Sequence, residues 1–182
     1  MNTSNLRLLI LFLLLLSLPG CRRANSEQRF QTAFAEANKI SDEQIKAMNE
    51  WAREFSQVFT EQNRAQFPAN RDWLKSRAQK ILPLMDQSSR LSDEAIAKYE
   101  EASRLMSNEQ HRKGLATIAE SFRKSGEIEQ LFKAQAQLPS DPTITDAKAF
   151  NEKFAYFNKL IQQKKKEKDE QFEEGKRLLL TQ

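Results

Sequence analysis

The chain has 182 residues, with 29 Lys or Arg, 25 Asp or Glu, one Cys and one His. This length fits a single domain, and 39% hydrophobic residues, including 12 Phe, argue against a disordered chain. One Cys excludes an intramolecular disulfide and a zinc site built on cysteines, and one His excludes a pair of histidine ligands in one chain.

The first 20 residues have the parts of a secretory signal. Arg7 supplies a positive charge, and residues 8–16 form an unbroken apolar run. As a helix, this run would span about 14 Å, whereas the hydrocarbon core of a bilayer is about 30 Å thick. Residues 1–20 are therefore predicted to be a signal peptide rather than a membrane span.

Residues 18–21, Leu-Pro-Gly-Cys, resemble the lipobox of bacterial lipoprotein precursors, the recognition site of the lipoprotein signal peptidase. That pattern has an aliphatic residue three positions before the cysteine and a small residue directly before it, which Leu18 and Gly20 match. Pro19 departs from the small or aliphatic residue usual at the middle position. The resemblance implies cleavage between Gly20 and Cys21, followed by acylation of Cys21 with diacylglyceryl and N-acyl groups. The alternative is that Cys21 is an ordinary thiol.

The same resemblance implies a location in the bacterial cell envelope, anchored to a membrane through Cys21. Under the enteric sorting rule, an Asp after the lipidated cysteine keeps a lipoprotein at the inner membrane. Arg22 stands there instead, which favours the periplasmic face of the outer membrane. Arg22 and Arg23 either contact anionic headgroups, at about 1 kcal/mol each, or belong to a solvated tether over residues 21–28.

The residues after the signal favour helices. Val58 is the only valine, no Asn-Gly or Asp-Gly pair is present, and Ala, Glu, Gln, Lys and Leu dominate. We therefore predict an all-α protein, a bundle of about four to six helices, some of them long. The bundle domain is expected over residues 29–163.

Two segments have the pattern of a helix start. Ser41 and Ser92 are each followed by Asp and Glu and flanked by apolar residues, which is typical of an N-cap with a hydrophobic staple. A sequence duplication at an offset of 51 residues is the alternative explanation of this similarity. The expected helices in this half of the chain cover residues 26–38, 42–63 and 70–87, the last kinked or ended by Pro83.

In the second half, residues 93–138 contain no proline and can form one long helix. Residues 107–114 carry no apolar side chain, so a bend, a break or an exposed crossing is expected there. Residues 138–142 form a proline-containing linker, after which a final helix is expected near Thr145 or Asp146. Its apolar seam consists of Phe150, Phe154, Phe157 and Ile161.

Beyond Ile161 the seam ends while the helix-forming composition continues. Residues 164–182 are therefore predicted to be a charged helical extension, a candidate interaction arm whose removal would leave the melting temperature nearly unchanged. Between residues 159 and 177, seven basic residues are offset by five acidic ones, which favours a solvated helical face over a nucleic-acid site. The alternative is a weak contact with anionic lipid or polysaccharide.

No phosphate-binding loop, nucleophile elbow, metal-binding motif or Cys-x-x-Cys motif is present. The sequence thus predicts no catalytic, cofactor-binding or metal-binding residues, no cofactor and no enzyme activity; Cys21 is the one candidate site. We expect a lipid-anchored protein that acts through a protein partner of the envelope, without nucleic acid. The alternative is a helical module that binds an apolar or anionic small molecule near Trp51, Trp73 or the late Phe residues. The oligomeric state is left open.

Overall fold

A computed structural model describes residues 21–180; the predicted signal peptide, Gly20 and residues 181–182 lie outside the described range. The described residues form five α-helices and no strand, which confirms the all-α prediction. The elements are α2 (Cys21–Val58), α3 (Glu61–Ala65), α4 (Arg71–Leu105), α5 (Glu109–Gln137), the short 3-10 turn η1 (Leu138–Ser140) and α6 (Ala147–Leu180).

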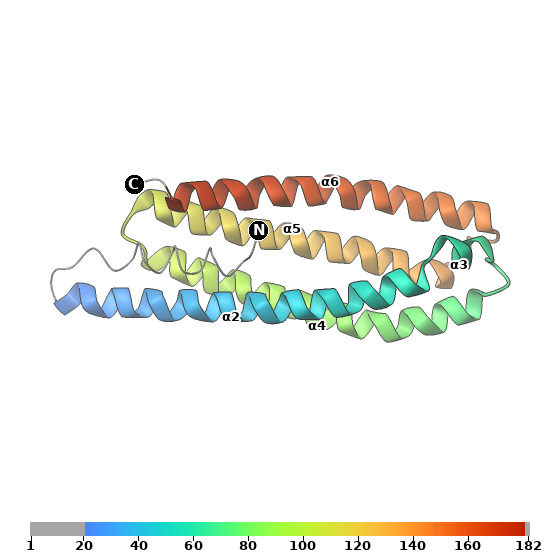
Figure 1. Ribbon diagram of the computed structural model, residues 1–182, viewed down its shortest axis with the longest axis horizontal. Coiled ribbons are helices and arrows are strands. Elements are labelled where there is room, and N and C mark those ends of the chain that lie inside the picture. Colours follow the sequence, from blue (N-terminus) through green and yellow to red (C-terminus); the bar gives the residue numbers. More distant parts are fainter. Residues whose placement is uncertain (1–20, 181–182) are drawn as a thin grey trace.

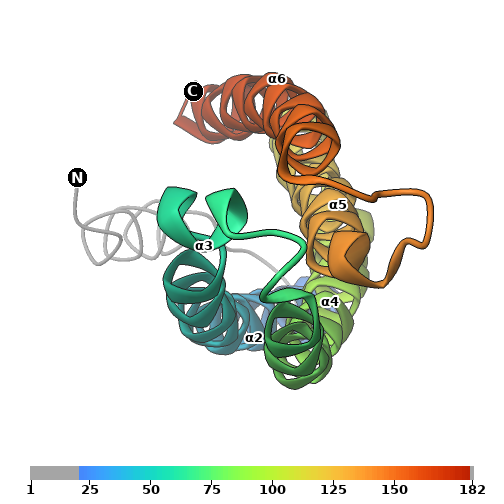
Figure 2. The ribbon, with the colours of Figure 1, turned by 90° about the vertical axis from the view of Figure 1, so that its right-hand side faces the viewer.

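The four long helices run up and down the bundle, each packed against the next one in the chain (Figure 1). Seen from the end, they form a curved row from α2 through α4 and α5 to α6 (Figure 2). The outer helices approach one another at the end that holds α3. There, the ring of Phe154 lies 6.2 Å from that of Phe55 and 5.9 Å from that of Phe59.

The predicted helix start at Ser41 is wrong, because α2 runs without interruption through this position. The Ser41 side chain is buried, and its Oγ donates to the carbonyl oxygen of Ala37 at 2.8 Å. A serine can bond in this way to the preceding turn of its own helix. The same helix already includes residues 21–28, for which the sequence predicted a tether.

The second expected start, at Ser92, is also wrong. Helix α4 continues through Ser92 and through Pro83, which faces solvent. Ser92 is buried, and its Oγ donates across the bundle to the carbonyl oxygen of Phe122 in α5 at 3.3 Å. Both serines therefore face the core, whereas the Ser-Asp-Glu pattern predicted that they cap helices.

The predicted break in the polar segment 107–114 is confirmed. Helix α4 ends at Leu105, and α5 begins at Glu109 after a three-residue connection. Asn108 caps α5, because its side-chain oxygen accepts a hydrogen bond from the backbone N–H of His111 at 3.0 Å.

The proline-containing linker and the start of the last helix are confirmed as well. Residues 138–146 connect α5 to α6, and Asp146 accepts a hydrogen bond from the backbone N–H of Ala149 at 2.8 Å. From there α6 continues to Leu180 as one helix.

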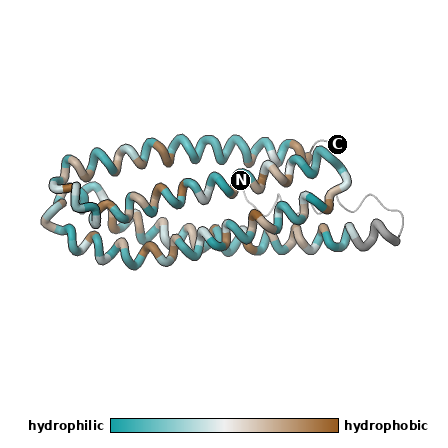
Figure 3. The backbone as a smooth tube through the Cα atoms, turned by 180° about the vertical axis from the view of Figure 1, so that it is seen from behind, coloured by the Kyte–Doolittle hydropathy of each residue, from teal (hydrophilic) through white to brown (hydrophobic). Residues whose placement is uncertain are grey.

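The apolar side chains form two separate clusters along the bundle, consistent with the spaced hydrophobic positions on each helix (Figure 3). Cluster one, at the end with α3 and η1, contains Trp51, Phe55, Val58, Phe59, Phe67, Leu74, Ala78, Ile81, Met85, Ala136, Leu138, Ile144, Phe150 and Phe154. Cluster two, at the end with Cys21, contains Phe30, Ala33, Phe34, Ala37, Tyr99, Ala102, Leu115, Ile118, Ala119 and Leu179.

The second half of α6 belongs to this packing. Gly175, Leu178 and Leu179 are buried, so residues 164–180 cover α5 and are part of the bundle. A Cβ atom on Gly175 would lie 2.9 Å from the carbonyl oxygen of Gly114 and 2.8 Å from the Ile118 side chain. The two helices thus approach closely at this glycine pair. Removing residues 164–182 would take away part of the core, contrary to the expectation for a free arm.

We predict that Gly175→Ala destabilises the protein by about 1–3 kcal/mol, because the added methyl meets backbone that cannot move aside cheaply. The matched control is Gly126→Ala in the interior of α5, where a Cβ would meet nothing within 4 Å. This control should stabilise the protein by about 0.5–1 kcal/mol. Urea unfolding of both variants measures the difference. Equal effects of the two substitutions would show that α6 does not pack closely on α5.

Candidate functional site

Within residues 26–180 no three His, Cys, Asp or Glu side chains are grouped so that they could hold a metal ion. None of the helices in the described range combines the length and apolar character needed to cross a membrane. Cys21, the predicted lipidation site, is the first residue of α2. Gly20, on the other side of the predicted cleavage point, lies outside the described residues.

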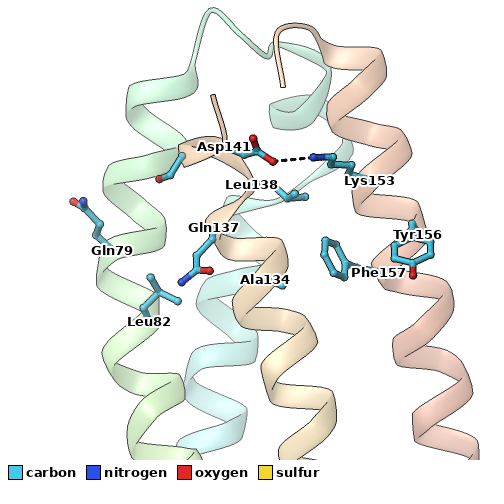
Figure 4. Close-up of a pocket in the computed structure, with 10 residues that line it drawn as sticks. Gln79, Leu82, Ala134, Gln137, Leu138, Asp141, Lys153, Tyr156 and Phe157 are labelled. Carbon is cyan, nitrogen blue, oxygen red and sulfur yellow. Dashed lines mark hydrogen bonds and ion pairs between the residues drawn. The ribbon is translucent and has the colours of Figure 1, made fainter. Parts of the chain in front are cut away.

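A groove of about 700 Å³ lies at the opposite end of the bundle, over the last turn of α5 and η1 and between α4 and α6 (Figure 4). Its apolar surface comes from one or two side chains of each element, including Leu82, Leu138 and Phe157. Tyr156 stands on the α6 side and is 60% exposed. The groove is also lined by Gln79, Ala134, Gln137, Ser140, Asp141 and Lys153.

An ion pair joins the linker to α6 at the rim of this groove. Lys153 Nζ donates to Asp141 Oδ2 at 2.8 Å, and the hydroxyl and backbone N–H of Thr143 donate to Asp141 Oδ1 at 2.6 and 2.9 Å. The Lys153 ammonium and the Thr143 donors hold the pKa of Asp141 well below its ordinary value of 3.8. The rim of the groove therefore carries the Lys153–Asp141 ion pair, which lies beside the apolar side chains that line the groove.

The aromatic residues considered as ligand contacts have different locations. Trp51 is only 3% exposed, and its ring packs on Phe132 at 5.1 Å between centroids, as part of the core. Trp73 is 42% exposed beneath the guanidinium of Arg77 and does not line the groove. Among the late Phe residues, Phe157 is the one that reaches the groove.

A buried polar layer lies between the two apolar clusters and was not predicted. Its centre is Glu129 of α5, which is 1% exposed. Glu129 Oε1 accepts from Gln44 Nε2 at 3.1 Å and from Ser88 Oγ at 2.7 Å, and Oε2 accepts from Ser89 Oγ at 2.8 Å. Lys133 donates to Ser89 at 3.0 Å at the edge of the layer. The sequence does carry a signal, since Gln44 continues the apolar face of its helix toward Met48 and Trp51.

The lysines of the basic run in α6 are partnered. Lys164 pairs with Glu127 of α5 at 2.7 Å and with Glu167 at 3.4 Å, and Lys165 lies over the ring of Phe132 at 5.8 Å. The next lysines pair with acidic residues of α6 itself: Lys166 with Glu170 and Lys168 with Asp169. Lys164 and Lys165 therefore contact α5, whereas Lys166 and Lys168 are paired within α6.

In comparisons with known proteins, no family model, no curated protein and no solved structure matches the chain.

We predict that the Asp141 ion pair makes a contribution to stability that acid removes. A carboxylate with a lowered pKa stabilises the fold above its ordinary pKa and loses this contribution as the pH falls below about 4. Asp141→Asn should therefore be less stable than the wild type at pH 7, and this difference in stability should narrow as the pH falls from about 4 toward 2.

Thermal unfolding across this range measures the effect. The control is Asp93→Asn, which removes an exposed carboxylate that has no ion pair within the described residues. If the difference in stability between Asp141→Asn and the wild type stays constant with pH, the prediction is contradicted.

Proposed function

We propose that the protein is a lipid-anchored helical bundle of the bacterial cell envelope that faces the periplasm and acts by binding a protein partner rather than by catalysis. The observation that carries the proposal is the position of its only Cys, which ends the lipobox-like segment and begins α2. Each methylene of an acyl chain contributes about 0.8 kcal/mol on entering the bilayer, so several chains on Cys21 would give lasting membrane residence.

The length of the bundle supports a role at a distance from the membrane. Helix α2 has 38 residues and is about 57 Å long. The groove is lined by residues of η1 and the end of α5, and Figure 1 shows that α5 ends at the opposite end of the bundle from the start of α2. An anchored protein can therefore present the groove away from the bilayer. A tether of this kind raises the local concentration for partners at the same membrane without any new contact. Arg22 favours the outer membrane as the final location.

The second candidate function is binding of an apolar or anionic small molecule. The groove favours it, because 700 Å³ lies within the usual range for ligand pockets, about 300–1,000 Å³, and its floor is apolar. An anionic group of the ligand would bind Lys153 at the rim in competition with Asp141.

We predict that Cys21→Ser abolishes acyl labelling and prevents cleavage of the signal peptide, because the serine offers no sulfur for thioether formation. The control is the double variant Cys21→Ser with Ser26→Cys, which keeps one thiol but moves it away from the lipobox-like segment; it should not be labelled either. Radiolabelled palmitate and intact-mass measurement follow the modification. A Cys21→Ser protein that is still cleaved and found with membranes would refute the anchor.

We also predict that a photoreactive residue in place of Tyr156, beside the groove, crosslinks to a protein in intact cells. The matched position is Trp73, which is exposed at the same end of the bundle but outside the groove. Adducts at both positions alike would argue against a partner at the groove. The small-molecule candidate would be favoured if no protein adduct forms and an apolar dye binds to the protein. Leu82→Glu should then weaken the binding of this dye.

A further inference from the structure

The buried polar layer separates two apolar cores that have no shared members. Glu129 is the one charged side chain among the described residues that is buried, and it lies between the clusters with Gln44, Ser88 and Ser89. Ser92 and Ser41 extend the buried polar positions toward cluster two. Outside both clusters, the buried apolar side chains of α2, α4 and α5 are Ala47, Ala95 and Ile128. Apolar contact, the main source of cooperative stability, is therefore reduced across these three helices.

The hydrogen bonds of the layer connect three helices but replace little of that contact. A net hydrogen bond stabilises a fold by about 1 kcal/mol, and one to a charged group by about 1.5–3 kcal/mol. Small hydroxyl side chains such as Ser88 and Ser92 bury little apolar area. The helix segments at each end of the bundle are therefore held together mainly by the apolar packing of the cluster at that end.

The two cores are unequal. Cluster one has six aromatic side chains and two alanines among its 14 buried members, and both α3 and η1 close its end of the bundle. Among the described residues, cluster two has ten buried members, of which three are aromatic and four are alanines. Since buried area sets most of the stabilisation, the cluster-two end is the weaker unit.

We propose that the polar layer divides the bundle into two cooperative units, and that the cluster-two end opens while the cluster-one end stays packed. Opening frees the first half of α2, the first turns of α5 and the last turns of α6, and it exposes apolar side chains such as Phe30, Phe34 and Leu115. This inference goes beyond the proposed function and does not depend on lipidation. In an anchored protein, the opening would take place beside the membrane, because Cys21 begins α2 at this end.

Native-state hydrogen exchange in low urea, on the purified native protein, tests the division. We expect amides in residues 30–40, 114–121 and 172–179 to share one opening, with one urea dependence, and about tenfold lower protection than residues 47–58 and 128–137. Shared behaviour of three separate helices distinguishes this opening from fraying of one helix end. Equal protection and equal urea dependence at both ends would overturn the proposal, as would lower protection in cluster one.

Two kinds of variant test the role of the layer itself. Gln44→Leu with Glu129→Leu makes the core continuous, so the difference in protection between the two ends should shrink to less than about threefold. Glu129→Gln is the matched control, because it keeps the shape of the layer and one acceptor oxygen for Gln44 and Ser88, while its amide N–H can donate to the Ser89 hydroxyl. It should leave the difference unchanged. A difference that survives in the double variant would overturn the role of the layer.

If the double variant does not fold, Gly175→Ala supplies an independent test. It forces α5 and α6 apart at cluster two. Protection should fall about tenfold in the cluster-two amides and remain unchanged in cluster one. An equal loss at both ends would show that the bundle opens as one unit.

Discussion

A buried carboxylate must receive hydrogen bonds from its neighbours, and in this bundle that requirement fixes how three helices align. The two oxygens of Glu129 accept from Gln44 of α2 and from Ser88 and Ser89 of α4. If α2 or α4 slid by one turn, about 5.4 Å, these donors would lose Glu129 and leave its charge unpaired in the interior. The layer therefore sets the register of α2, α4 and α5, and the apolar cores form on either side of it.

The close approach of α5 and α6 is a second constraint. Gly114 and Gly175 leave no room for a Cβ atom, and the Lys164–Glu127 pair joins the same two helices nearer the middle of the bundle. These contacts explain why a segment rich in charge belongs to the packed structure. The groove and Tyr156, the site proposed for a partner or ligand, lie at the opposite end of the bundle from this glycine pair.

Sequence patterns predicted most of the fold because they reflect local physics. The polar gap before α5 and the prolines of the linker mark real helix ends, and the Phe150 and Phe154 seam is buried as expected. The predictions were wrong where a residue was selected by contacts with another helix and not by its own helix end. Ser41 and Ser92 resemble caps because both a cap and a buried polar layer favour small hydroxyl side chains.

An all-α chain could be predicted from the residues alone, and the lipobox-like segment at Cys21, on which the proposed anchor rests, is likewise a feature of the sequence. Helix propensity and proline positions depend on neighbouring residues only, so they can be read without the fold. Only the packed helices show that residues 164–180 belong to the bundle, that Glu129 is buried and that residues of α4, α5 and α6 line one groove. Each of these depends on residues far apart in the chain, whose contacts exist only after the helices have packed.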